Sequence, residues 1–123
     1  PKIPPHIKAL QLLEDLPKKR LSEQKLQKQY YTELTEIIWV YLEERFGIFA
    51  SEMTSTQILS QVKLNNNISQ NNYSILERIF NTSDLVKFAK YETEQITDKN
   101  ILANAKEFVV NTKEELELNE PNE

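Results

Sequence analysis

The sequence predicts an all-α protein: a compact bundle of about five or six helices around one long central helix, residues 22–46. Two observations lead to this fold class. The 123 residues include one glycine, Gly47, and no run that alternates apolar and polar residues as a half-buried strand does. Apolar residues instead recur at helical spacing within segments rich in Leu, Glu, Lys and Gln, which favour helices.

The central helix carries the strongest pattern in the chain. We expect Ser22 to cap its first turn and Gly47 to end it in a left-handed conformation. All six residues from Ile37 to Leu42 are apolar or aromatic, so we expect the chain itself to cover this segment on every side. The apolar stripe consists of Leu26, Tyr30, Leu34, Ile37 and Tyr41.

Shorter helices are predicted on both sides of this element. A first helix should begin near Pro5 or His6 and end before Pro17. The capping box Thr54-Ser55-Thr56-Gln57 predicts the start of a third helix. Residues 64–72 contain five asparagines, which predicts a mobile surface loop that tolerates insertions.

Three further helices are expected towards the carboxyl end. One spans residues 73–80 and ends at Asn81-Thr82, and Ser83 then caps a separate segment, residues 84–91. The last helix opens at Thr97-Asp98, and its apolar face should pack across the central helix. That face consists of Ile101, Leu102, Ala105, Phe108, Val109 and Thr112.

The composition also predicts how the chain is divided. Residues 1–5 hold three prolines and form an extended lead-in, and residues 6–112 form a single helical domain. Residues 113–123 contain five glutamates and one lysine, so we expect an acidic, disordered tail.

No catalytic set is recognisable, so we expect a protein that is not an enzyme. Cysteine is absent, and His6 is the sole histidine, so no metal site is predicted. One glycine cannot build a phosphate-binding loop, and we expect neither a cofactor nor a small-molecule substrate. A catalytic Ser/Lys pair, hidden until the fold is known, stays open as an alternative.

Charge is distributed unevenly along the chain. Residues 1–31 carry seven basic and three acidic side chains, whereas the remaining residues carry eight basic and sixteen acidic ones. A basic entry before an acidic body is typical of cytoplasmic juxtamembrane segments, and it predicts contact of the N-terminal basic residues with inner-leaflet lipid. Chance surface charge is the alternative. The same count disfavours nucleic acid.

Two surfaces are candidates for binding a macromolecule. Asp84, Lys87, Lys90 and Tyr91 mix charge with aromatic side chains in one short segment, which suits a protein-docking patch. The alternative function is DNA binding by a helix-turn-helix formed by residues 54–64 and 73–80, although the second helix has a single basic residue, Arg78.

Several strings resemble uncharacterised proteins of Bacteroidota. They are Pro4-Pro5-His6, the segment Tyr30 to Ile37, the segment Tyr41 to Ile48, Glu52-Met53-Thr54 and the segment Asp84 to Tyr91. Over about residues 4–112 the chain is similar to cytosolic C-terminal domains of membrane-anchored proteins related to the Bacteroides aerotolerance (Bat) family. The resemblance implies a transmembrane helix upstream of Pro1, a domain at the cytoplasmic face of the inner membrane, and an operon-encoded protein partner. It implies no chemistry.

Overall fold

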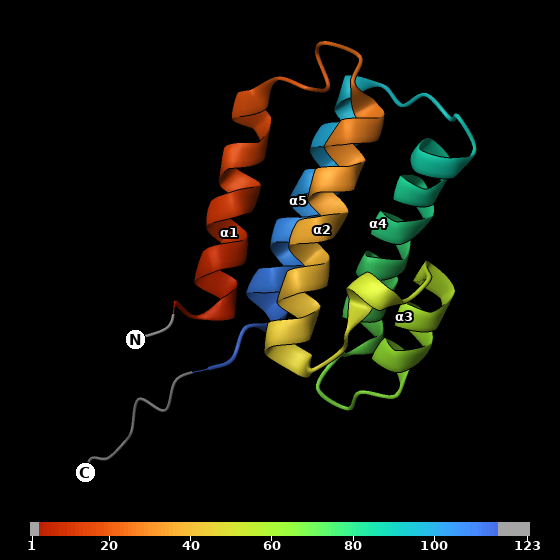
Figure 1. Cartoon of the computed structure of the whole chain (residues 1–123). Helices are drawn as coiled ribbons and strands as arrows, with labels where there is room; N and C mark the ends of the chain where they lie inside the picture. Colours follow the sequence, from red (N-terminus) through yellow and green to blue (C-terminus); the bar gives the residue numbers. More distant parts are fainter. Residues whose placement is uncertain (1–2, 116–123) are drawn as a thin grey trace.

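Residues 3–115 of the chain are described by a computed structural model, and within them all regular secondary structure is helical (Figure 1). The five helices are α1 (Pro5–Asp15), α2 (Gln27–Phe46), α3 (Ser55–Lys63), α4 (Gln70–Phe88) and α5 (Gln95–Thr112). Short 3₁₀ turns at Leu16–Lys19 and Ala50–Glu52 complete the elements. The predicted all-α class is confirmed for this part of the chain.

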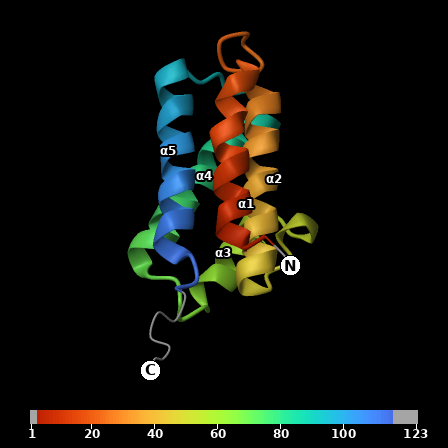
Figure 2. The ribbon, with the colours of Figure 1, turned by 90° about the vertical axis from the view of Figure 1, so that its left-hand side faces the viewer.

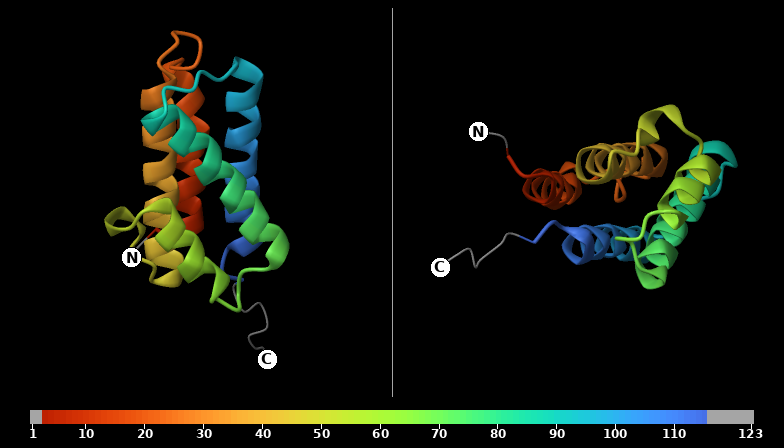
Figure 3. Two further views of the ribbon diagram at one scale, coloured as in Figure 1. Left: turned by 90° about the vertical axis from the view of Figure 1, so that its right-hand side faces the viewer. Right: turned by 90° about the horizontal axis from the view of Figure 1, so that it is seen from below.

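Four helices stand side by side, and the short α3 packs along the lower part of α4 (Figures 1 and 3). Helix α1 contacts both α2 and α5, and α4 contacts the same two helices from the other side (Figure 2). The α1–α2 and α4–α5 connections lie together at one end of the bundle, which we call the connector end (Figure 1). The first turn of α1 and the last turn of α5 lie at the opposite end.

One continuous core joins all five helices. The side chains of Tyr31, Leu34 and Ile38 on α2 are completely buried, and so is Val62 on α3. The predicted apolar face of the last helix is confirmed, because all six of its residues are buried. Most of that face packs against α4 and α1, and Phe108 makes an edge-to-face contact with Tyr41 of α2.

The expected covering of residues 37–42 on every side is wrong. Ile38, Tyr41 and Leu42 are buried, but Ile37 and Trp39 are only partly buried and Val40 is 41% exposed. The reason is the place of α2 between α1 and α4, with α5 behind it. Within residues 3–115 no α-helix covers the remaining outer side of α2, and Ile37, Trp39 and Val40 line surface hollows there.

Several helix boundaries differ from those predicted, and α5 begins at Gln95 instead of residues 97–98. Helix α2 begins at Gln27, because residues 21–26 form a turn in which Lys25 has a φ of 61° and the Leu26 N–H donates to the Leu21 carbonyl at 2.8 Å. Helix α4 is one continuous element, so the predicted break at residues 81–82 is wrong. Ser83 caps nothing: its buried hydroxyl donates to the Ile79 carbonyl at 2.7 Å, which satisfies it inside the helix.

The predicted terminal signals are confirmed at two places. Gly47 ends α2 with a φ of 71°. At the start of α3, the Gln57 N–H donates to Thr54 Oγ1 at 3.2 Å and the Thr54 N–H donates to Gln57 Oε1 at 2.9 Å.

The asparagine-rich stretch is partly helical, contrary to expectation. Ser69 caps α4, so the last three of residues 64–72 belong to a helix, and Ile68 before them is buried in the core. Residues 1–2 of the predicted lead-in and residues 116–123 of the predicted tail lie outside the described residues.

Candidate functional site

The predicted docking residues lie together around the C-terminal end of α4. Asp84 and Lys87 belong to its last turns, and Lys90 follows with a φ of 57°. This left-handed residue turns the chain back, so that the N–H of Tyr91 donates to the Leu85 carbonyl at 3.1 Å. The four predicted residues therefore share one end of one helix.

Lys87 uses its ammonium group within the chain. Its Nζ donates to Thr35 Oγ1 on α2 at 3.0 Å and lies 4.9 Å from the centre of the Trp39 ring and 5.4 Å from that of Phe88. Burial lowers the pKa of Lys87, and the negative charges of Asp84 and Glu36 oppose that shift. Lys87 thus ties α4 to α2.

Apolar side chains dominate the exposed part of this helix end. Phe88 is 78% exposed, Tyr91 53% and Leu85 48%. Apolar spacing alone does not show whether a face is covered, because that depends on which helices pack against it. We call Asp84, Leu85, Phe88, Lys90 and Tyr91 the α4-end surface.

A buried carboxylate, missed by sequence reasoning, lies at the connector end. Asp98 has no exposed surface, and its two oxygens accept hydrogen bonds from three hydroxyl groups. Ser22 donates at 2.6 Å, Thr93 at 2.6 Å and Tyr31 at 2.7 Å. The hydroxyl of Tyr30 donates to the Asp98 carbonyl at 3.0 Å. This Asp98 cluster joins the first turn of α5 to α2 and to both connections.

The chemistry of the Asp98 cluster is that of a structural junction. Burial, reinforced by the negative charge of Asp98, raises the pKa of Tyr30 and Tyr31 well above the ordinary value, so both stay protonated as donors. Three of the cluster's hydroxyls donate to one carboxylate, which compensates its burial. No single sequence signal could have found this cluster, because residues 22 and 31 lie more than 60 positions before residues 93 and 98.

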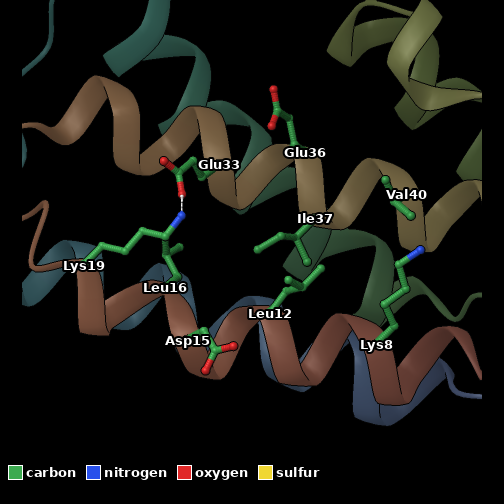
Figure 4. Close-up of a pocket in the computed structure, with 9 residues that line it drawn as sticks. All are labelled: Lys8, Leu12, Asp15, Leu16, Lys19, Glu33, Glu36, Ile37 and Val40. Atoms are coloured by element: carbon green, nitrogen blue, oxygen red, sulfur yellow. Dashed lines mark hydrogen bonds and ion pairs between the residues drawn. The ribbon is translucent and has the colours of Figure 1, made fainter. Parts of the chain in front are cut away.

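A groove runs between α1 and α2 on the outer side of the bundle (Figure 4). Its volume is about 470 Å³, and its apolar lining consists of Leu12, Leu16, Ile37 and Val40. The Lys19 ammonium lies 2.6 Å from Glu33 Oε1 towards one end. This bond, followed by one from Gln29, lowers the pKa of Glu33.

A second ion pair lies beyond the other end of the groove, where Lys8 Nζ is 3.2 Å from Glu44 Oε2. Leu12 and Val40 are each 41% exposed, so the apolar floor is open to solvent between the two ion pairs.

No candidate metal site is found in the described part of the chain. Within residues 3–115 no group of three or more His, Cys, Asp or Glu side chains could hold an ion.

The segment predicted as a DNA-recognition helix, residues 73–80, is the middle of α4. Ile75, Leu76 and Ile79 are buried there, and Arg78 Nη1 donates to Asn104 Oδ1 of α5 at 3.4 Å. The exposed side of α4 therefore offers one arginine that already has an intramolecular acceptor. DNA binding itself stays a prediction.

Most basic residues of the N-terminal region lie at the connector end, far from residue 3 (Figure 1). They follow α1, whose 11 residues span about 16 Å. Three of them have acidic neighbours, Lys18 with Asp15, Lys19 with Glu33 and Arg20 with Glu23.

Comparison with protein-family models, with curated proteins and with solved structures found no match. The resemblance to aerotolerance-related proteins therefore stays a prediction. Among the described residues, no helix is both long and apolar enough to cross a bilayer.

Proposed function

We propose that this domain is a non-enzymatic protein-interaction module, the cytoplasmic part of a membrane-anchored protein at the inner membrane. Its partner is a protein encoded in the same operon, as the resemblance to aerotolerance-related proteins implies. The α4-end surface is the docking site. The observation that carries this proposal is the exposure of three neighbouring apolar side chains, Leu85, Phe88 and Tyr91.

The backbone under this surface is held in place, which favours binding over chance exposure. The N–H groups of Ala89 and Tyr91 both donate to the Leu85 carbonyl, at 3.0 and 3.1 Å. Phe88 also lies near the Lys87 ammonium, which is itself bonded to α2. Aromatic side chains presented on a fixed backbone are typical of binding hot spots, because little conformational entropy is lost when they dock.

The arrangement of charge constrains how the domain meets lipid. A tether before Pro1 would join the end that holds the first turn of α1, whereas Lys18, Lys19, Arg20, Lys25 and Lys28 lie at the connector end (Figure 1). With a short tether, these basic residues can reach the lipid only if the bundle lies along the membrane surface. With an upright bundle, the connector end and the α4-end surface face the cytoplasm.

Phe88 provides the sharpest test of the docking site. The full-length protein is recovered from its native membranes with Phe88→Ser, Lys90→Glu or no change, and the captured partner is then purified and titrated. We expect Phe88→Ser to weaken binding about tenfold or more, and Lys90→Glu to weaken it less. Lys87 is unsuitable for this test, because its replacement would disturb the contact between α4 and α2.

Leu64→Ser is the matched control, because Leu64 is also 78% exposed but lies at the end of α3. Equal binding by the Phe88→Ser and Leu64→Ser proteins would overturn the α4-end surface. Recovery of the full-length protein in the soluble fraction after lysis would overturn the proposed membrane anchor.

A further inference from the structure

A second binding surface follows from the groove between α1 and α2. We infer that this groove binds a basic amphipathic helix of a partner protein. The inference goes beyond the proposed function, because the groove and the α4-end surface are formed by different elements.

The floor of the groove is built to receive apolar side chains. Leu12 of α1 and Ile37 of α2 point towards each other across it, and Val40 lies beside them (Figure 4). Between the Lys19–Glu33 and Lys8–Glu44 ion pairs α2 advances eleven residues, from Glu33 to Glu44, about 16 Å or three helical turns. A partner segment of that length would cover the exposed parts of Leu12 and Val40.

Charge decides the kind of segment that fits. The groove and two neighbouring hollows, one of which shares Lys8 with it and the other Glu36 and Val40, are lined by two lysines and five carboxylates. Both lysines are already paired with glutamates. On the α2 rim, Glu36 and Glu43 are exposed and form no ion pair with any other described residue. The net charge of this lining is therefore negative, although the charge of Glu36 also acts on Lys87, and a negative lining complements lysine or arginine.

The walls of the groove select a helix over an extended strand. A strand binds by pairing its backbone with an exposed sheet edge, but both walls here are helices whose backbone groups are bonded internally. A third helix can instead lay an apolar stripe over the seam of two packed helices, with its flanking lysines over Glu36 and Glu43.

The test uses two synthetic amphipathic peptides of about 15 residues that share a leucine face. One carries lysine on its polar face and the other carries glutamate. Binding to the ¹⁵N-labelled chain is followed by amide chemical shifts. We expect the lysine peptide to bind at least tenfold more tightly than the glutamate peptide, with shifts confined to α1 and α2 and with affinity that falls as salt rises.

Val40→Lys places a repelling charge in the floor, and we expect it to weaken binding of the lysine peptide about tenfold. Val110→Lys on α5 is the matched control, because Val110 is 47% exposed and the change in net charge is the same. Phe88→Ser should leave peptide binding unchanged, so failure of this inference is distinguishable from failure of the α4-end surface. Equal affinities of the two peptides, absence of binding, or equal effects of Val40→Lys and Val110→Lys would overturn it.

Discussion

At the scale of single residues, Asp98 joins three separate segments of the chain. Its carboxylate receives hydroxyl donors from the α1–α2 connection, from α2 and from the α4–α5 connection, each at 2.7 Å or less. Hydrogen bonds to a charged group contribute more to stability than neutral ones, and a buried partner left unpaired costs further free energy. The stability of the connector end therefore depends on this one side chain.

We expect Asp98→Asn to lower the free energy of unfolding by about 3 kcal/mol, because the amide removes the charge and turns a donor towards hydroxyl groups that already donate. Chemical denaturation followed by circular dichroism measures the change. Glu107→Gln on the same helix is the control, since Glu107 is exposed. An unfolding midpoint for Asp98→Asn equal to that of Glu107→Gln would contradict the role of the cluster.

The buried tyrosines predict how stability depends on alkaline pH. The pKa of Tyr30 and Tyr31 is raised in the folded chain, first by burial and then by Asp98, whereas the unfolded chain titrates near 10. Below pH 10 their contribution to stability is fully present. It is lost as pH rises above 10, because the unfolded chain then releases tyrosine protons that the folded chain retains.

Unfolding midpoints measured between pH 9 and about pH 11 should consequently fall as pH rises. Tyrosinate absorbance should increase together with unfolding. The decline should be shallower in Tyr31→Phe, which lacks one of the tyrosines whose pKa is raised in the folded chain. Identical slopes for the two proteins would show that other groups, such as lysines, produce the effect.

At this scale the sequence predicted local contacts and missed distant ones. The Thr54–Gln57 capping box and the turn at Gly47 were predictable because all their partners lie within a few residues. Asp98 appeared only as a residue that opens a helix, and Lys87 only as a surface charge. Their roles depend on Tyr31 and Thr35, which the fold brings to them from α2.

At the scale of elements, α4 shows how local signals can mislead. Asn81, Thr82 and Ser83 all favour caps and turns, and together they predicted a break between two helices. The structure continues through them because Ile79, Phe80 and Val86 fill the core on one face, and Ser83 satisfies its own hydroxyl on the Ile79 carbonyl. Burial of that face outweighs the weak local preference.

Proline substitution distinguishes one continuous helix from two. We expect Thr82→Pro to destabilise the protein by about 3 kcal/mol, because it removes a hydrogen bond inside α4 and clashes with the preceding turn. Gln70→Pro is the control, since Gln70 occupies the first position of α4, where proline is tolerated. Denaturant titration measures the free energy of unfolding of both variants. Similar values for Thr82→Pro and Gln70→Pro would indicate that α4 is interrupted at residue 82.

At the scale of the whole molecule, the all-α class followed from helix-forming composition and apolar spacing, because both are properties of the chain itself. The open outer side of α2 did not follow. Ile37 to Leu42 read as a segment apolar all round, yet the number of neighbours around α2 depends on how five helices pack. The exposure of Val40, and with it the floor of the groove, is therefore a property of the assembled bundle.

One core predicts one cooperative transition. We expect Val62→Ala in α3 to lower global stability by about 2 kcal/mol, since Val62 is completely buried within the core shared by all helices. Helicity and Trp39 fluorescence should report the same unfolding midpoint, although Trp39 is on α2. If helicity were lost at a lower denaturant concentration than the native Trp39 fluorescence, α3 and α4 would unfold as a separate unit.

Two contacts on neighbouring residues of α2 place the beginning of α1 and the end of α5 beside the same helical turn. Lys8 bonds Glu44, and Arg45 donates to the Thr112 carbonyl at 2.8 Å. A domain with this geometry can be inserted into a surface loop of a larger protein without stretching the recipient, because entry and exit are adjacent. For the same reason, a circular permutant should also fold. In it a linker joins the end of α5 to the beginning of α1, and the new chain ends lie at Asn66.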